Sequence, residues 1–177
     1  MATILAFAGS NSSTSINFEL VKYTCSLIQN QNIQLLNMVN FPFPMYSSDY
    51  EKEKGFSNSL IELNQDIQRA DGLIISVNEH NGGPSAYFKN LTDWLSRLDI
   101  KFLAGKKVFL LSTSPGKGGG GNSLALSNTR LTRFGAEVTA TFSMPSFNGN
   151  FDKEDGILDA KLSKAHKTAL EDFLAKI

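Results

Sequence analysis

The chain has 177 residues, of which 41% are hydrophobic and 19% charged, a composition typical of a soluble globular protein. At this length residues 1–177 are expected to form a single domain that buries about 70% of the surface of the unfolded chain. Lys and Arg together number 17, as do Asp and Glu, so the formal net charge is zero. This balance excludes the strongly basic field of a non-specific nucleic-acid binder, and we expect no nucleic-acid partner.

Features of secreted and membrane proteins are not found in the sequence. The apolar run Ile4–Ala8 lacks a basic leader and is too short for a signal peptide, and no stretch approaches the roughly 18 apolar residues of a membrane span. The single Cys25 cannot form an internal disulfide and sits in a helical pattern, so we interpret it as a buried small hydrophobic residue. With only His80 and His166, a multi-histidine metal site is excluded. We expect a cytoplasmic protein without a metal or a membrane partner.

Apolar runs of strand length alternate with amphipathic stretches of helix length along the chain. This alternation is typical of a parallel sheet that is covered by helices on both faces. In chain order we expect a strand at Thr3–Ala8, a helix at Ile16–Gln29, a strand at Ile33–Met38, a helix at Ser57–Ala70, a strand at Leu73–Val77, a helix at Ser85–Leu98, a strand at Lys107–Ser112, a helix at Asn122–Phe134, a strand at Glu137–Phe142 and a helix at Asp159–Ile177. The segment Phe41–Tyr46 contains two prolines and is expected to be extended.

This order of elements predicts an α/β fold, specifically a flavodoxin-like three-layer sandwich with a five-stranded parallel sheet in the order 2-1-3-4-5. The polar alternation within Ile33–Met38 favours an edge position for the second strand. In this order the chain reverses direction between the first and third strands. The loops at residues 9–15 and 78–83 then flank one crevice, with the loop at residues 112–121 beside them, and ligands of α/β proteins bind in such a crevice.

The first of these loops is rich in groups that bind anions. Six hydroxyl or amide side chains occupy the positions from Ser10 to Ser15, directly before a predicted helix. Backbone N–H groups and the positive end of the helix add to them, so the loop is expected to bind a phosphate. Simple capping of the helix is the alternative, but it needs just one of these side chains. The glycine spacing of a dinucleotide fingerprint is absent.

The third loop, Ser112–Gly121, contains Gly116 and Lys117 but does not match the phosphate loop of nucleotide triphosphatases. No glycine stands five residues before Gly116, and neither Ser nor Thr follows Lys117. The four glycines at Gly118–Gly121 are typical either of backbone that approaches a flat ligand closely or of a flexible turn.

The second loop carries the chemically most versatile side chain of the three. His80 is a candidate proton donor or a group that stacks on or bonds to a ligand, and a solvated loop histidine is the alternative. Glu79 either contributes to the site or has a structural role, in a salt bridge or as a cap of the predicted helix Ser85–Leu98. Trp94 is expected in the core or at a subunit interface, and Asp93 is expected to be a surface charge.

Three motifs together resemble the NADPH-dependent FMN reductase family, flavodoxin-like NAD(P)H:flavin and quinone oxidoreductases. Gly9-Ser10 with Ser15 and Asn17 resembles the family's phosphate loop. The run Asn78–Gly82, followed by Lys89-Asn90 and Asp93-Trp94, resembles its Pro-Glu-Tyr-Asn-Gly…Lys-Asn…Asp-Trp motif, and Ser114–Gly119 resembles its third flavin-contacting loop. The resemblance extends over the whole chain in length and element order.

The resemblance implies an FMN-dependent oxidoreductase that takes hydride from NADPH or NADH and passes electrons to a quinone, azo compound, free flavin or similar small molecule. It implies a homodimer or homotetramer. It assigns no catalytic residue with certainty, although His80 is the candidate. The implied cofactor-binding residues are Ser10, Ser12, Ser15, Ile16 and Asn17 at the phosphate, Asn78, Glu79, His80, Asn81 and Gly82 along the isoalloxazine ring, and Ser114, Gly116, Lys117, Gly118 and Gly119 near its pyrimidine side.

The chain departs from the family pattern at four positions. Ser12 stands where many members have Arg, Asn78 replaces Pro, His80 replaces Tyr and Gly83 stands where Ser is frequent. Two other functions remain open from the sequence. One is a flavodoxin-type electron carrier without nicotinamide chemistry, although such carriers are usually strongly acidic. The other is a flavin-free α/β binding module.

Overall fold

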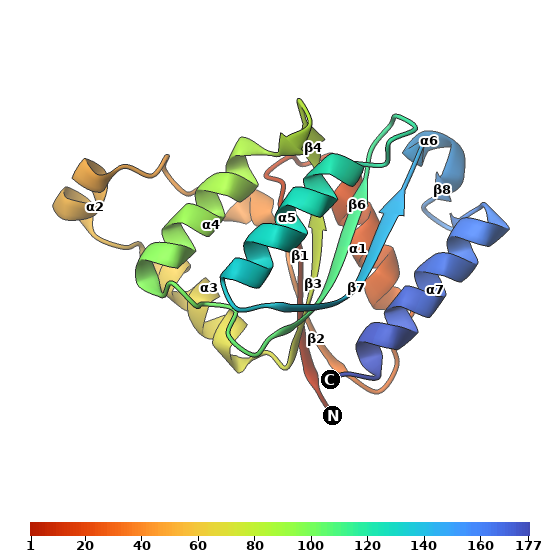
Figure 1. The fold of residues 1–177 in the computed structure, drawn as a ribbon, viewed down its shortest axis with the longest axis horizontal. Helices are drawn as coiled ribbons and strands as arrows, with labels where there is room; N and C mark the ends of the chain where they lie inside the picture. The colour runs from red at the N-terminus through yellow and green to blue at the C-terminus, as the bar shows by residue number, and fades with distance from the viewer.

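A five-stranded parallel sheet forms the centre of the computed structural model, which describes residues 1–177 (Figure 1). Its strands are β1 (Thr3–Ala8), β2 (Asn32–Leu36), β3 (Gly72–Val77), β6 (Lys107–Thr113) and β7 (Glu137–Met144). The strand order is β2-β1-β3-β6-β7, and every neighbouring pair is parallel. The predicted flavodoxin-like order and the edge position of the second strand are therefore confirmed.

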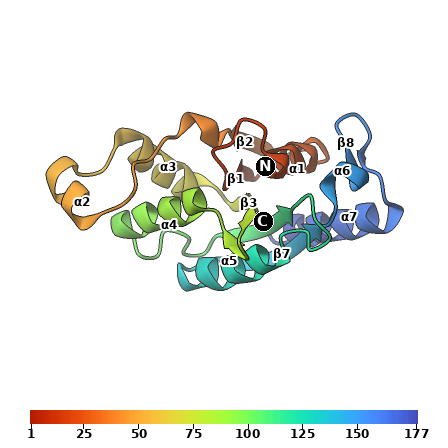
Figure 2. The ribbon, with the colours of Figure 1, turned by 90° about the horizontal axis from the view of Figure 1, so that it is seen from above.

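Helices cover both faces of the sheet (Figures 1 and 2). Helices α1 (Ile16–Ser26) and α7 (Ala160–Leu174) pack on one face, and α3 (Asn58–Arg69), α4 (Ala86–Leu98) and α5 (Gly121–Arg133) pack on the other. Successive side chains of a strand point to opposite faces. Accordingly, Leu5 and Phe7 of β1 belong to the core under α3 and α4, whereas Ile4 and Ala6 belong to the core under α1 and α7.

All predicted boundaries agree with the structure to within two residues, except the carboxyl-terminal ends of the first and last helices, which differ by three. Helix α1 ends at Ser26 and not at Gln29, because the chain turns at Asn30, which has a left-handed φ of 60°. Strand β2 ends at Leu36, since Asn37 caps the short 3-10 helix η1 (Met38–Asn40). Helix α7 ends at Leu174, three residues before the predicted end.

Several short elements were not expected from the sequence pattern. They are α2 (Ser48–Lys54), the hairpin of β4 (Glu79–His80) and β5 (Gly83–Pro84), α6 (Phe147–Asn150) and the hairpin of β8 (Phe151–Asp152) and β9 (Gly156–Ile157). Helix α2 has no buried residue and lies at the far end of the molecule from α7 (Figure 1). The Phe41–Tyr46 segment has neither helix nor strand, as the prolines predict.

The carboxyl ends of the parallel strands lie at one edge of the sheet, and the two chain termini lie together at the opposite edge (Figure 1). This arrangement brings the three polar loops that follow β1, β3 and β6 to the same edge. None of the helices combines the length and apolar character needed to cross a membrane.

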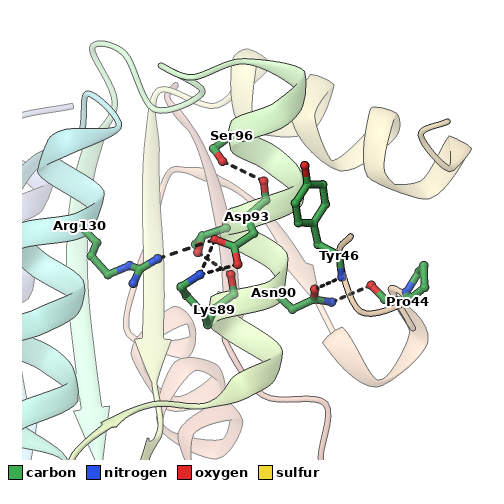
Figure 3. A network of polar contacts seen from close by, with 8 residues as sticks. Pro44, Tyr46, Lys89, Asn90, Asp93, Ser96 and Arg130 are labelled. Carbon is green, nitrogen blue, oxygen red and sulfur yellow. Dashed lines mark hydrogen bonds and ion pairs between the residues drawn. The ribbon is translucent and has the colours of Figure 1, made fainter. Parts of the chain in front are cut away.

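Three single-residue predictions concern positions away from these loops. Cys25 is buried, as expected, and burial raises the pKa of its thiol to about 12, so the thiolate nucleophile is not available near neutral pH. Trp94 is buried against the core on the α4 face. Asp93 is half-buried and accepts hydrogen bonds from Lys89, with Arg130 of α5 3.9 Å away (Figure 3).

Candidate functional site

The first loop is held rigidly against the sheet and against the start of α4. The Gly9 N–H donates to the Ser76 carbonyl at 2.8 Å, and the Ser85 hydroxyl donates to the Gly9 carbonyl at 2.8 Å. A Cβ atom at Gly9 would lie 2.5 Å from Cδ2 of Phe88, so only glycine allows this close approach. Because Ser85 also caps α4 by accepting from Phe88, the loop and the start of α4 form one unit.

Several backbone N–H groups of this loop have no partner within the protein. Ser15 caps α1 by accepting from the Phe18 N–H at 3.2 Å, and the Ser12 hydroxyl accepts from the Thr14 N–H at 3.3 Å. Five amides make no hydrogen bond within the chain, those of Ser10, Asn11, Ser13, Ile16 and Asn17. Unpaired amides at the positive end of a helix attract anions, so the loop can hold a phosphate through its backbone.

Asn17 has a different position from the one that a side-chain phosphate ligand would need. The residue is 2% exposed. Its Oδ1 accepts from the Ser76 hydroxyl at 2.7 Å and from the Thr113 N–H at 3.0 Å, and its Nδ2 donates to the Thr113 carbonyl at 3.1 Å. The side chain therefore ties the start of α1 to the ends of β3 and β6, and what it offers at the helix terminus is its backbone N–H.

The second loop is a tight hairpin in the structure. Asn81 and Gly82 both have positive φ angles, 50° and 77°, as a two-residue turn of type I′ requires. The carboxylate of Glu79 accepts from the Ser123 N–H at 3.0 Å, and the Ser123 hydroxyl donates to the Asn78 carbonyl at 2.9 Å. Helix α5 has no capping side chain of its own at Gly120, so Glu79 caps it from the neighbouring loop. The capping alternative thus holds for Glu79, on α5 and not on α4.

Asn78 and His80 present the free polar groups of this loop. The Nδ2 of Asn78 and the Nε2 of His80 are 3.3 Å apart, while Oδ1 of Asn78 is buried and has no hydrogen-bond partner. Buried polar atoms almost always have a partner, so this unpaired oxygen, on a residue that lines both cavities, is a candidate acceptor for a ligand donor. His80 itself is exposed.

In the third loop, the glycines divide between structural and exposed roles. The Gly119 carbonyl accepts from the hydroxyls of Ser112 at 2.8 Å and Ser143 at 3.0 Å, and its φ of 61° requires glycine. A Cβ atom at Gly119 would lie 2.5 Å from the Ser143 hydroxyl. By contrast, Gly116, Lys117 and Gly118 are exposed, and their N–H groups are unpaired.

The three loops surround two adjoining cavities. The first, of about 300 Å³, extends from the start of α1 to the end of β6 and is lined by Ser10, Ser12, Thr14, Ser15, Ile16, Asn17, Asn78, Glu79, His80, Thr113, Ser114 and Pro115. The second, of about 420 Å³, extends over the start of α4 and is lined by Ser10, Asn11, Ser12, Phe43, Met45, Asn78, His80, Ser85, Ala86, Tyr87 and Asn90. Four residues line both, namely Ser10, Ser12, Asn78 and His80.

The structure brings nine of the fifteen predicted site residues to these cavities. The other six, which line neither, are Asn81, Gly82, Gly116, Lys117, Gly118 and Gly119. Four residues that form much of the second cavity are not among the fifteen predicted site residues, namely Phe43, Met45, Tyr87 and Asn90. A signal was present, since Asn90 lies in one of the quoted motifs and Phe43 in the aromatic segment between two prolines.

Comparisons with known proteins agree with this arrangement. The chain is 40% identical over 77 residues to the quinone reductase of Escherichia coli, an alignment that covers 44% of this chain and 41% of that enzyme. The chain thus matches about two fifths of the length of that relative. It is 27% identical to the NADPH:quinone oxidoreductase of Arabidopsis thaliana over 94% of this chain and 87% of the plant protein.

A solved structure with the same fold is the flavoenzyme NAD(P)H:(acceptor) oxidoreductase FerB from Paracoccus denitrificans. It superimposes with a TM-score of 0.80 at 22% identity and covers 99% of this chain and 96% of that protein. The family model for NADPH-dependent FMN reductases matches residues 2–149, which include all three loops. From this match, which covers most of the chain, together with the flavodoxin-like sheet, the chain belongs to the NADPH-dependent FMN reductase family.

Proposed function

We propose that the chain binds FMN at the edge of the sheet and transfers electrons from NADPH or NADH to a small-molecule acceptor such as a quinone, an azo compound or a free flavin. One observation carries the proposal. The unpaired amides at the start of α1 belong to residues that line the same cavity as Asn78, whose Oδ1 is buried and has no hydrogen-bond partner. An anionic group and a hydrogen-bonding ring system would meet complementary partners among the residues that line this cavity.

The residues present fit FMN in both of its chemical parts. The amides of Ile16 and Asn17 and the hydroxyls of Ser10 and Ser12 would hold the phosphate, with the positive end of α1 behind them. Asn78 would offer the Oδ1 oxygen to an N–H of the isoalloxazine ring. The amides of Gly116 and Gly118 lie unpaired in the loop after β6, where donors to the ring oxygens are expected.

The cofactor, when bound, supplies two-electron hydride chemistry between a nicotinamide and an acceptor. With a quinone acceptor the net reaction is NAD(P)H + H⁺ + quinone → NAD(P)⁺ + hydroquinone. The chain contributes orientation and electrostatic complementarity, because its loops are held by buried hydrogen bonds before any ligand arrives. His80 lines both cavities and is the side chain that can give or take the additional proton.

Phosphate binding in this protein would depend on neutral donors. No Lys or Arg lines either cavity, and Glu79, the one carboxylate there, is engaged by the Ser123 N–H. We therefore propose that FMN binds more weakly than in relatives that have an arginine at the position of Ser12, since a charge-assisted bond is stronger than a neutral one. A homodimer or homotetramer remains part of the proposal by family resemblance.

The test is an anaerobic absorption spectrum of the protein with FMN, before and after addition of NADPH and then NADH. Saturable binding and rapid bleaching of the flavin band by either nucleotide would support the proposal and identify the preferred nucleotide. Bleaching by dithionite but by neither nucleotide would replace it with an electron carrier. A protein that binds no FMN would refute it. A Ser10→Ala and Ser12→Ala variant is expected to bind FMN more weakly by about 1 kcal/mol per lost hydrogen bond.

A further inference from the structure

The segment Phe41–Tyr46 lies against α4 without forming any regular structure. Pro42 and Pro44 have no N–H, so this segment cannot pair as a strand with its neighbours. Its carbonyl groups still need donors where they are covered. The donors come from one face of α4, from side chains that are three and four residues apart.

Three α4 side chains supply these hydrogen bonds. The Tyr87 hydroxyl donates to the Phe41 carbonyl at 2.9 Å, and the Trp94 Nε1 donates to the Pro44 carbonyl at 2.8 Å. Asn90, which lies between them on the helix, is 5% exposed. Its Nδ2 donates to the Pro44 carbonyl at 2.9 Å, and its Oδ1 accepts from the Tyr46 N–H at 2.8 Å (Figure 3). Asn90 alone both donates to the segment and accepts from it.

The segment held in this way forms one wall of the second cavity. Phe43 and Met45 line it together with Asn78 and His80. Met45 is 71% exposed, so a large apolar side chain stands at the rim without any partner that would cover it.

The lining of this cavity selects a chemical class of ligand. It contains four hydrophobic residues, and the rest are Ser, Asn and His, with no Lys, Arg, Asp or Glu. An anionic acceptor would therefore lose its hydration without gaining a counter-charge. A neutral, flat molecule could pack on Phe43, Met45 and Tyr87 and direct its polar atoms toward Asn78 and His80.

We propose that Asn90 is a positioning residue that holds Phe43 and Met45 as the wall on which a neutral planar acceptor packs. This inference rests on the proposed function, because the acceptor is the molecule that the bound cofactor reduces. It extends that function by assigning the acceptor class and the segment that selects it. In this role Asn90 acts through the backbone of residues 44 and 46, to which its side-chain amide is hydrogen-bonded.

The experiment compares wild type with Asn90→Leu, which removes both the donor and the acceptor while keeping a similar size. Hydrogen exchange is measured at the Tyr46 amide, and FMN affinity is measured by titration. The photoreduced FMN-loaded protein is then mixed with a naphthoquinone or with dioxygen, which is too small to need the wall. Asn64→Leu on α3 is the matched control, because Asn64 makes no hydrogen bond to the segment.

In Asn90→Leu we expect exchange at the Tyr46 amide to accelerate roughly tenfold, since its acceptor is lost. We expect the rate with naphthoquinone at low concentration to fall by about the same factor, as apolar contacts of this size predict. FMN affinity and the rate with dioxygen should stay within about twofold of wild type. Phe43→Ala with Met45→Ala should reproduce the slow naphthoquinone reaction without accelerating exchange at Tyr46, and it tests the acceptor wall even if Asn90→Leu does not fold.

Three results would overturn the inference. The first is a naphthoquinone rate that is unchanged in Asn90→Leu although the Tyr46 amide exchanges freely. The second is a decrease of FMN affinity together with a decrease of both oxidation rates in Asn90→Leu, which would mean that Asn90 supports cofactor binding and not the acceptor wall. The third is a full naphthoquinone rate in the variant that lacks Phe43 and Met45. A wild-type protein that binds no FMN would instead refute the proposed function, and the inference with it.

Discussion

The Asn17 side chain provides a quantitative test of how the site is built. It joins three elements through three buried hydrogen bonds, to the Ser76 hydroxyl and to the N–H and carbonyl of Thr113. If these contacts are its main role, Asn17→Ala destabilises the protein in the absence of any ligand. If the side chain instead binds phosphate, as its place in the phosphate-loop motif suggested, Asn17→Ala weakens FMN binding and leaves the stability of the free protein intact.

The expected loss of folding stability in Asn17→Ala follows from the hydrogen bonds that the substitution removes. A neutral hydrogen bond contributes about 1 kcal/mol net, and three are lost. The partners that remain are almost fully enclosed, since Ser76 is 0% and Thr113 is 1% exposed, so water cannot easily replace the amide. We therefore expect the free energy of unfolding to fall by about 3 to 4 kcal/mol, a large part of the total stability of a typical domain.

Urea denaturation of the FMN-free protein at pH 7 measures this loss. Ser13→Ala is the control, because Ser13 is an exposed residue of the same loop whose side chain makes no hydrogen bond. A double-mutant cycle of Asn17→Ala with Ser76→Ala should give a coupling free energy of about 1 kcal/mol for the 2.7 Å bond. A loss of stability below about 1 kcal/mol, together with weaker FMN binding, would refute the structural role.

Three further changes have definite expected outcomes. Ser12→Arg should tighten FMN binding about tenfold at low salt, by adding a charge-assisted bond to phosphate, and a titration at high salt should reduce the gain. Burial lowers the pKa of His166 from 6.5 to about 4, so the free energy of unfolding should fall by up to about 3 kcal/mol as pH decreases through this range; His166→Gln should flatten that dependence in urea titrations. Gly9→Ala should cost about 1 to 3 kcal/mol through the clash with Phe88, whereas Gly83→Ala, with nothing within 4 Å, should be nearly neutral in thermal melts.

The sheet was predictable because its signal is local. Buried parallel strands appear as short continuous apolar runs, and Leu73–Val77 and Val108–Leu111 are such runs. The right-handed crossover rule then leaves few topologies. Boundaries that depend on one capping residue were less predictable. Strand β2 stops where Asn37 accepts from the Val39 N–H, an interaction that the apolar pattern of residues 33–38 conceals.

The parts of the site that depend on long-range contacts were not predictable from local patterns. The contact of Asn17 with Thr113 spans 96 residues, and that of Asn90 with Tyr46 spans 44. Both asparagines carry the same side chain as the exposed Asn11. Sequence alone does not distinguish an asparagine that holds the fold together through buried hydrogen bonds from one that binds a ligand. The hairpin at Asn81-Gly82 could have been predicted from the sequence, because this dipeptide is a strong local signal for a two-residue turn. Residues 78–83 were nevertheless interpreted only as a loop.

A few buried and half-buried polar side chains in and beside the three loops fix the shape of these loops, and this explains how the site can tolerate departures from the family pattern. Glu79 caps α5, Ser112 and Ser143 hold Gly119, and Asn17 connects α1 to two strands. The loop shape is thus determined before a ligand binds, so unpaired backbone amides remain oriented whatever side chain stands at position 12, 78 or 80. Substitutions at those three positions change the charge and the stacking surface of the cavity lining. Loss of a buried hydrogen-bonding side chain such as Asn17 would instead change the shape of the cavity.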